Sequence, residues 1–427
     1  MASVKPFQAL HYHPQNISIG KVVAPPYDII SPDENKKLHD RDPHNVIRLE
    51  LGDPDAKNSP QDSVYIASAH CLSEWIKTGV LIKDSKPAYY LYEMNYQHPF
   101  KQQTLRRLAL FGALKLEPFE NKVVFPHEKT HSTAKVDRMK LLKKTECNFS
   151  PIFGLYEDSS NTLDSIYEAT KKTKPMYEFQ DEKKTTHKLW RIESASEIRS
   201  IENTFSKTGI FIADGHHRYE TALNYALEKN GGSISRKNLW DYVLTAFVRF
   251  HDPGLLILPI HRVVLNTVSI DQENLLAGLK KHFQVHAASK AEITKAAEGQ
   301  KVKGFGVAFS EQECYFLELK NEQTAFDAMP KGKPKSWYSL DITQVSHLIL
   351  EPFLNMDGAH LEKTLSYTAN TEEAFGLLRE RKSPCVFFVR PLQAPVIKKI
   401  CESGELMPQK STYFYPKFPS GLLMYKH

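Results

Sequence analysis

The sequence predicts a mixed α/β (α+β) protein, and three observations indicate this fold class. Segments with helical hydrophobic periodicity alternate with short apolar, strand-like segments along the chain. No internal repeat is apparent, so a solenoid or propeller is not expected. The hydrophobic and charged fractions, 41% and 25%, are those of an ordinary soluble globular protein.

The first part of the chain supplies packing elements. Ser31 precedes an acidic, polar stretch and is expected to cap a short helix. Segments of amphipathic period end near glycine, and segments rich in Tyr, Leu and Phe have strand composition. We therefore expect helices over residues 64–78 and 136–144 and strands over residues 88–95, 108–116 and 150–156.

The later elements follow the same logic. The apolar segment 210–214 predicts a buried strand, and the stretch 219–229, which two glycines follow, predicts a helix. His251, Asp252, Pro253 and Gly254 form a turn signal between two apolar segments. Further strands are expected over residues 242–250, 255–260, 304–309, 313–319 and 384–390.

The length of 427 residues exceeds what one ordinary core accommodates. Turn residues indicate an approximate boundary near residue 250. We expect three regions: an N-terminal α/β region over residues 1–115 packed on the core, the core itself over residues 116–250, and a C-terminal α/β region over residues 251–427 that closes it.

Charge and cysteine usage limit the function classes. The net charge of +6 is spread along the chain without a Lys/Arg block, so anionic small ligands are expected and nucleic acid is not. The cysteines are odd in number and scattered, which argues against a disulfide framework. No apolar h-region or membrane-length apolar run occurs, so we expect a cytoplasmic protein without membrane contact.

The central motif joins the strand at 210–214 to a charged turn: Asp214 ends the strand, Gly215 permits a left-handed backbone, and His216, His217 and Arg218 open the helix. A helix N-terminus with an adjacent arginine binds phosphate. The alternative is a polar network or capping arrangement without a ligand. One carboxylate beside three cation-capable groups, at the carboxyl end of a strand, favours the phosphate site.

A second motif contains His127, Glu128, Lys129 and His131, and its spacing matches the zincin pattern His-Glu-x-x-His. A zinc peptidase needs both histidines on one face of a stable helix. Because Pro126 precedes the motif and no helical period leads into it, a loop is the preferred interpretation. A zinc hydrolase remains the lesser alternative.

A loop carboxylate at Glu128 can accept a proton from a substrate hydroxyl, while His127 and Lys129 position the substrate or neutralise phosphate charge. Phosphoryl transfer requires this combination of base and cations, usually with Mg²⁺. The alternative for Lys129 is an ordinary solvated surface lysine.

The third motif lies in a turn within residues 404–417, where Lys410 is followed by the hydroxyl residues Ser411 and Thr412. A lysine next to two hydroxyls can bind phosphate or carboxylate. A rigid terminal turn with an aromatic plug is the structural alternative.

Together the three motifs, Pro-His-Glu, Asp-Gly-His-His-Arg and Pro-x-Lys-Ser-Thr, resemble those of the archaeal free serine kinases, which have a ParB/sulfiredoxin-like fold. Over nearly its whole length, with Ala-Pro-Pro-Tyr-Asp near the start, the chain also resembles a family of long bacterial and archaeal proteins called uncharacterised. The spacing between the first two motifs exceeds that of the compact archaeal enzyme.

The kinase resemblance implies roles for the residues of all three motifs. Glu128 matches the catalytic glutamate and His127 its substrate-positioning neighbour, while Asp214 matches a second catalytic acid that assists deprotonation or holds Mg²⁺. The resemblance implies a nucleotide-binding set that comprises Gly215, His216, His217, Arg218, Lys410, Ser411 and Thr412.

The sequence thus predicts a small-molecule kinase that transfers a phosphoryl group from ATP or ADP, with Mg²⁺, to a hydroxyl. Free L-serine, giving O-phosphoserine, is the first substrate hypothesis. The main alternative is a ParB-like nucleotide-binding regulatory module without transfer chemistry.

Overall fold

The computed structural model describes residues 1–52, 62–130, 132–299, 304–356, 361 and 363–427. The chain forms two compact units. Unit 1 comprises residues 1–126, 130–255 and 416–427, and unit 2 comprises residues 127–129 and 256–415. Each unit is therefore built from segments that are far apart in the sequence.

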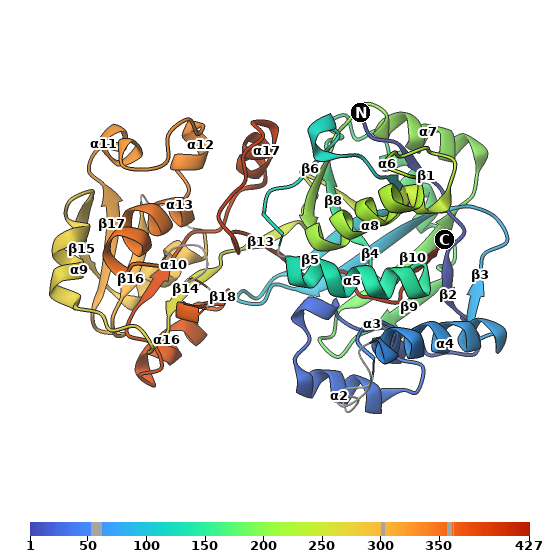
Figure 1. Cartoon of the computed structure of the whole chain (residues 1–427), viewed down its shortest axis with the longest axis horizontal. Helices are drawn as coiled ribbons and strands as arrows, with labels where there is room; N and C mark the ends of the chain where they lie inside the picture. Colours follow the sequence, from blue (N-terminus) through green and yellow to red (C-terminus); the bar gives the residue numbers. More distant parts are fainter. Residues whose placement is uncertain (53–61, 131, 300–303, 357–360, 362) are drawn as a thin grey trace. The chain divides into compact units, whose positions relative to one another are not determined.

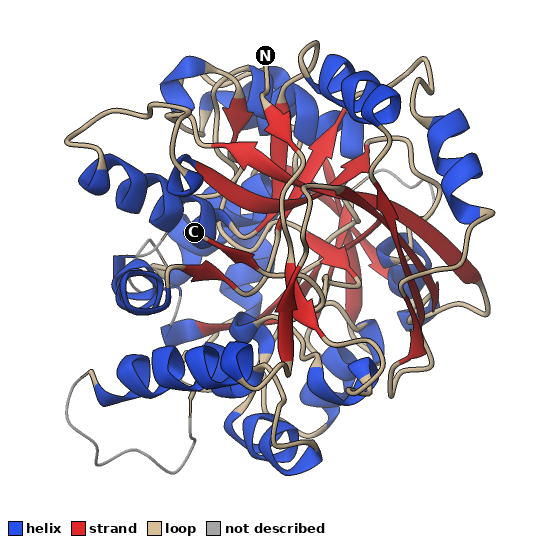
Figure 2. Ribbon diagram, turned by 90° about the vertical axis from the view of Figure 1, so that its right-hand side faces the viewer, coloured by secondary structure: helices blue, strands red, loops and turns tan. Residues whose placement is uncertain are grey.

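The helices and strands confirm the predicted α/β class (Figures 1 and 2). A strand or helix is present at each position where the sequence indicates one, with ends that differ by a few residues. Ser31 caps α2 as expected, because its hydroxyl accepts a hydrogen bond from the Glu34 backbone N–H at 3.2 Å. The ParB/sulfiredoxin-like assignment and the three-region division remain predictions.

The strands of unit 1 vary from two residues to twelve, and the longer ones are visibly twisted (Figure 2). They are β1 (Val4–Lys5), β2 (Leu10–Tyr12), β3 (Leu81–Lys83), β4 (Tyr89–Gln97), β5 (Thr104–Lys115), β6 (Val124–Phe125), β7 (Cys147–Asn148), β8 (Ile152–Tyr156), β9 (Tyr177–Gln180), β10 (Thr186–Ile192), β11 (Ile210–Asp214), β12 (Tyr242–Arg249) and β21 (Tyr425–Lys426).

Among the described residues, nine strands form the main sheet of unit 1, in the order β6-β11-β8-β12-β5-β4-β10-β9 with β1 paired to β5. The sheet is mixed, because β11 runs parallel to β6 and antiparallel to β8. Phe125 of β6 lies opposite Phe211 of β11, so the ends of these two strands share one edge. Asp214 and Pro126 follow at that edge.

The helices of unit 1 cover the main sheet and the N-terminal segment, and α5 packs along α8 (Figure 1). They are α1 (Ile19–Val22), α2 (Pro32–Arg41), α3 (Ile47–Glu50), α4 (Ser63–Lys77), α5 (Ser132–Thr145), α6 (Asp164–Lys171), α7 (Ala195–Phe205) and α8 (His216–Lys229), with the 3-10 turns η1 (Tyr27–Ile29), η2 (Phe119–Asn121) and η3 (Leu239–Asp241).

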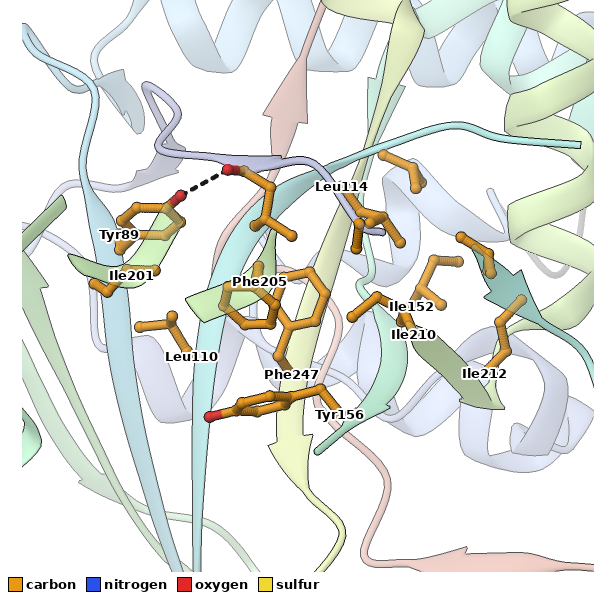
Figure 3. Packing of buried hydrophobic residues seen from close by; sticks show 14 of the residues in the cluster. Tyr89, Leu110, Leu114, Ile152, Tyr156, Ile201, Phe205, Ile210, Ile212 and Phe247 are labelled. Carbon is orange, nitrogen blue, oxygen red and sulfur yellow. Dashed lines mark hydrogen bonds between the residues drawn. The ribbon is translucent and has the colours of Figure 1, made fainter. Parts of the chain in front are cut away.

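The core of unit 1 joins the main sheet to α6, α7 and α8. Phe205 of α7 packs its ring 4.6 Å from that of Phe247 and 4.8 Å from that of Tyr156 (Figure 3). Tyr89 is fully buried yet satisfied, because its hydroxyl donates to the Val4 carbonyl at 2.9 Å. Apolar burial thus fixes the sheet that carries β11.

Unit 2 has its own strands and helices. Its strands are β13 (Leu256–Leu258), β14 (His261–Val264), β15 (Phe283–Ala288), β16 (Phe305–Ala308), β17 (Cys314–Leu319), β18 (Leu365–Thr368), β19 (Val386–Phe388) and β20 (Tyr413–Tyr415). Its helices are α9 (Gln272–Leu279), α10 (Lys290–Ala297), α11 (Glu322–Asp327), α12 (Lys335–Tyr338), α13 (Asp341–Val345), the π-helix η4 (Ser346–Leu350), α14 (Glu351–Leu354), α16 (Thr371–Arg379) and α17 (Ala394–Glu402).

The main sheet of unit 2 is antiparallel in the order β15-β17-β16-β19-β14-β18. Helix α16 packs on it through Phe375, whose ring stacks 4.5 Å from that of Phe388. A separate ladder pairs β13 with β20 and holds the segment that follows the Lys-Ser-Thr turn. In the part of the chain that the structure describes, no helix is long and apolar enough to cross a membrane.

Candidate functional site

The junction of β11 and α8 has the backbone geometry that the central motif predicts. The pairing of β11 with β8 shifts register between Ile212 and Asp214, which indicates a local irregularity at the strand end. Gly215 is left-handed, with φ +90°, and α8 begins at His216. The N-terminal backbone N–H groups and the positive dipole end of this helix therefore follow Asp214 directly.

Asp214 lies between two cations of unit 1. Arg218 donates from Nη2 to Asp214 Oδ2 at 2.6 Å, and Lys417 donates from Nζ to Asp214 Oδ1 at 2.5 Å. Lys417 also contacts Asp28 Oδ2 at 3.0 Å. Because Asp28, Lys417, Asp214 and Arg218 alternate in charge, we call these four residues the Asp214 cluster.

Low exposure strengthens the interactions of the Asp214 cluster. The exposed fractions of the side chains are 17% for Asp214, 12% for Arg218 and 11% for Lys417. Burial lowers the pKa of Lys417, but Asp214 and Asp28 more than offset it, and the pKa is raised. The pKa of Arg218 is raised by the same balance of burial and carboxylates. Both cations therefore stay charged at neutral pH.

Arg218 has a second fixed contact, because its Nη1 donates to the Pro151 carbonyl at 2.5 Å. Of the two histidines of the motif, His216 is buried and His217 is partly exposed. The first turn of α8 thus has one guanidinium held in a defined orientation.

Unit 2 brings together the second and third motifs. The Ser411 backbone N–H donates to Glu128 Oε1 at 3.0 Å, and His127 Nε2 lies 2.8 Å from Thr412 Oγ1. The Met407 N–H donates to the His127 carbonyl at 2.8 Å. Residues 127–129 belong to no helix or strand, which agrees with the loop interpretation. The turn at residues 407–412 therefore fixes the Pro-His-Glu loop.

The lysines of these two motifs are more exposed than the residues beside them. Lys129 and Lys410 are both exposed, and Lys410 has a left-handed backbone with φ +55°. Arg262 of β14 is 2% exposed and donates from Nη2 to the Gln409 carbonyl at 3.2 Å. Burial lowers the pKa of Arg262 to about 10, although Tyr367 and Glu128 raise it.

The zinc alternative concerns His127 and His131. His131 lies outside the described residues. Among the described residues, no three His, Cys, Asp or Glu side chains are grouped so that they could hold a metal ion.

Magnesium at Asp214 remains a prediction. Both carboxylate oxygens of Asp214 are bonded to cations, Oδ1 to Lys417 and Oδ2 to Arg218. Mg²⁺ prefers free carboxylate oxygens together with substrate phosphates and water. As they lie, these side chains do not fit a magnesium site.

Sequence reasoning assigned Asp214 and Arg218 together but did not assign Lys417, Asp28 or Arg262 a role. Lys417 ends the turn segment 404–417, and Asp28 ends the Ala-Pro-Pro-Tyr-Asp motif. Their opposite charges were the feature of the sequence that could have indicated their pairing. The buried Arg262 was recognisable only as a cation at the end of an apolar strand.

A protein-family model matches residues 4–343, which is the greater part of the chain. The chain belongs to the DUF1015 family. The family is described as "Protein of unknown function". Membership confirms the resemblance to a family of long, uncharacterised proteins. No curated protein matches this DUF1015 chain.

Several solved structures resemble the DUF1015 chain distantly. A conserved hypothetical protein from Pyrococcus furiosus has a TM-score of 0.35 and 13% identity, covering 73% of this chain and 93% of its own. A free serine kinase in complex with AMP has a TM-score of 0.33 and 12% identity, covering 71% and 86%. SbnI with C-terminal truncation, from Staphylococcus aureus, has a TM-score of 0.35 and 10% identity, covering 73% of this chain and 85% of its own. Similarities this low do not by themselves indicate what the chain does.

Proposed function

We propose that this DUF1015 protein is a small-molecule kinase that transfers a phosphoryl group from ATP or ADP to a hydroxyl, with free L-serine as the first substrate to test. The observation that carries the proposal is the first turn of α8, where helix N–H groups and a fixed guanidinium follow a left-handed glycine. This arrangement suits nucleotide phosphates.

The Asp214 cluster supports the nucleotide-binding role. Asp214 and the Pro151 carbonyl hold Arg218 in one orientation, so little side-chain entropy remains to be lost when phosphate binds. Lys417 adds a second cation in the same cluster. Asp214 accordingly positions cations, and His216 and His217 contribute to the same helix start.

Glu128 is the proposed general base. Its side chain is 22% exposed, and the Ser411 N–H fixes the orientation of its carboxylate. Glu128 accepts the proton of the substrate hydroxyl as the new O–P bond forms and the bond to the nucleotide leaving group breaks. His127, Lys129, Lys410, Ser411 and Thr412 are the proposed neighbours for substrate and phosphate.

The decisive experiment is phosphorus NMR on the full chain with magnesium, ATP or ADP, and L-serine. We expect a new phosphomonoester signal that Glu128→Gln reduces by about a hundredfold or more, because a general base contributes roughly 10²–10⁴-fold. Nucleotide affinity, measured by calorimetry, should change little in this variant.

The matched control is Glu402→Gln, which changes an exposed glutamate of α17 in unit 2 and should keep full turnover. Full turnover by Glu128→Gln would reject Glu128 as the base. Nucleotide binding without any phosphomonoester from a pool of amino acids and polyols would reject the kinase and favour a nucleotide-binding regulatory module.

A further inference from the structure

Unit 1 contains a cavity of about 50 Å³ that shares one residue, Arg218, with the proposed nucleotide site. The cavity lies where the end of α3, the helices α5 and α8, and the segment before β8 meet. Its polar lining includes Tyr27, Glu50, Arg138, Ser150, Arg218 and Thr221.

Two buried polar atoms of this lining lack hydrogen-bond partners among the described residues. Glu50 is 4% exposed; its Oε1 accepts from the Ser150 hydroxyl at 2.7 Å, whereas its Oε2 has no partner. The hydroxyl of Thr221, a residue that is 2% exposed, also has none. Burying such atoms without partners costs free energy, which a ligand with N–H donors would offset.

The charges of the lining indicate the sign of that ligand. Arg138 is paired with Asp137, with Nε to Oδ2 at 2.7 Å, and Arg218 is paired with Asp214. Within the described part of the chain the Glu50 carboxylate makes no ion-pair contact, because Arg138 donates to the Glu50 backbone carbonyl, at 3.0 Å, and not to the carboxylate. The charge of Glu50 helps to raise the pKa of Arg218, but its Oε2 accepts no hydrogen bond and can accept one from a cation.

We propose that this cavity binds the ammonium group of a small primary amine, with Glu50 Oε2 and the Thr221 hydroxyl as acceptors. An ammonium has three donors and a compact charge, so one ammonium can donate to more than one acceptor of this lining. The volume is well below the roughly 150 Å³ of a cavity that holds benzene, so it admits the ammonium end of a small amine and not a nucleotide base.

The Tyr27 ring contributes a wall of this cavity. Arg138 stacks on it, with Cζ 4.2 Å from the ring centroid. The proposal rests on the proposed function only in one respect, the identification of this amine with the phosphoryl acceptor. An amino acid and an amino alcohol both have an ammonium group, and they differ in the carboxylate that only the amino acid has.

The test is calorimetric titration of the full chain with L-serine and ethanolamine, compared with glycolate and ethylene glycol, which lack the amine. We expect at least one of the two amines to bind and the amine-free compounds to bind at least tenfold more weakly. Glu50→Gln should weaken amine binding at least tenfold and leave ATP affinity unchanged. Glu228→Gln, on the exposed side of α8, is the matched control and should bind as the wild type does.

Equal binding of the amine-free compounds, or no binding of either amine, would overturn the proposal, as would full amine affinity in a folded Glu50→Gln variant. If that variant does not fold, the comparison of ligands on the wild type and the amine affinity of Thr221→Val test the proposal instead.

Binding of ethanolamine as well as L-serine would show that the ammonium suffices, whereas binding of L-serine alone would add its carboxylate to the recognition. Amine binding without phosphoryl transfer would reject the kinase and keep the amine site. Phosphoryl transfer to L-serine with an unchanged KM in Glu50→Gln would reject the amine site and keep the kinase.

Discussion

Arg218 and Lys417 contact the same carboxylate from very different sequence separations. Arg218 is four residues from Asp214, whereas Lys417 is 203 residues away. The first pairing could be predicted, because residues four apart share a face at a helix start. The second could not, since no local pattern indicates which distant lysine will approach a given aspartate.

Removal of the Arg218 guanidinium is predicted to weaken nucleotide binding. Charge-assisted hydrogen bonds contribute about 1.5–3 kcal/mol, so Arg218→Ala should raise the nucleotide Kd roughly tenfold to a hundredfold. Calorimetric titration with ADP measures this change. Arg199→Ala, on the exposed face of α7, is the control. An unchanged Kd in Arg218→Ala would remove α8 from the nucleotide site.

His261 is predicted to make the stability of unit 2 depend on pH. Burial, with Arg262 nearby, lowers the His261 pKa to about 3, from an ordinary value of about 6.5. Between these values the unfolded chain binds a proton that the folded chain does not, so stability is lost as the pH falls from 6.5. The contribution is at most about 1.4 kcal/mol for each pH unit.

Scanning calorimetry at several pH values between 7 and 4 tests this contribution. His261→Gln should flatten the fall in stability, whereas His286→Gln, at an exposed position on β15, should keep the wild-type slope. An identical slope in His261→Gln and the wild type would contradict the assignment.

At the scale of elements, each segment with a clear hydrophobic period or strand composition corresponds to a helix or strand, because these signals are local. Elements with a weaker signal, such as α7 and β10, were not predicted. The body of α8 was predicted over residues 219–229, and the helix begins at His216, within the charged turn that was expected to open it. Polar residues carry no hydrophobic period, so this first turn was indicated by Gly215 and the charged motif. The pairing order of the strands depends on contacts between distant segments and could not be predicted.

Gly215 is predicted to be essential for the start of α8. A Cβ at this position would lie 3.1 Å from three atoms of the Arg218 guanidinium group, and its φ of +90° is unfavourable for other residues. Gly215→Ala should therefore cost about 1 kcal/mol of stability and also weaken nucleotide binding by displacing Arg218.

Gly231→Ala provides a matched comparison at the other end of α8. Its φ is +67°, and an added Cβ would meet nothing within 4 Å. It should lose similar stability while keeping nucleotide affinity. Thermal unfolding and nucleotide titration of both variants measure the difference, and equal nucleotide affinities would show that Arg218 is not displaced.

At the scale of the whole molecule, the sequence indicated several packed regions but not their discontinuous composition. Residues 416–427 belong to unit 1 although residues 256–415 belong to unit 2. The terminal segment pairs β21 with β7 and buries Phe418 and Met424. Such a return depends on contacts far apart in sequence, so neither composition nor punctuation predicts it.

Deletion of residues 416–427 is predicted to unfold unit 1. Loss of a large buried side chain costs about 2–5 kcal/mol, and the segment buries several, against a typical domain stability of roughly 5–15 kcal/mol. Hydrogen exchange of the β7 and β12 segments in the truncated and full chains would detect this. Lys417→Met, which removes only the charge, should retain the fold. Full protection in the truncated chain would contradict the prediction.

The position of Lys417 has a consequence for synthesis. Ribosomes make Asp28, Asp214 and Arg218 long before Lys417, so a nascent chain holds the acids of the cluster without their shared ammonium. Only a polypeptide that extends to Lys417 can assemble the complete cluster. A chain that stops before residue 417 therefore keeps Asp28 and Asp214 without the ammonium that joins them.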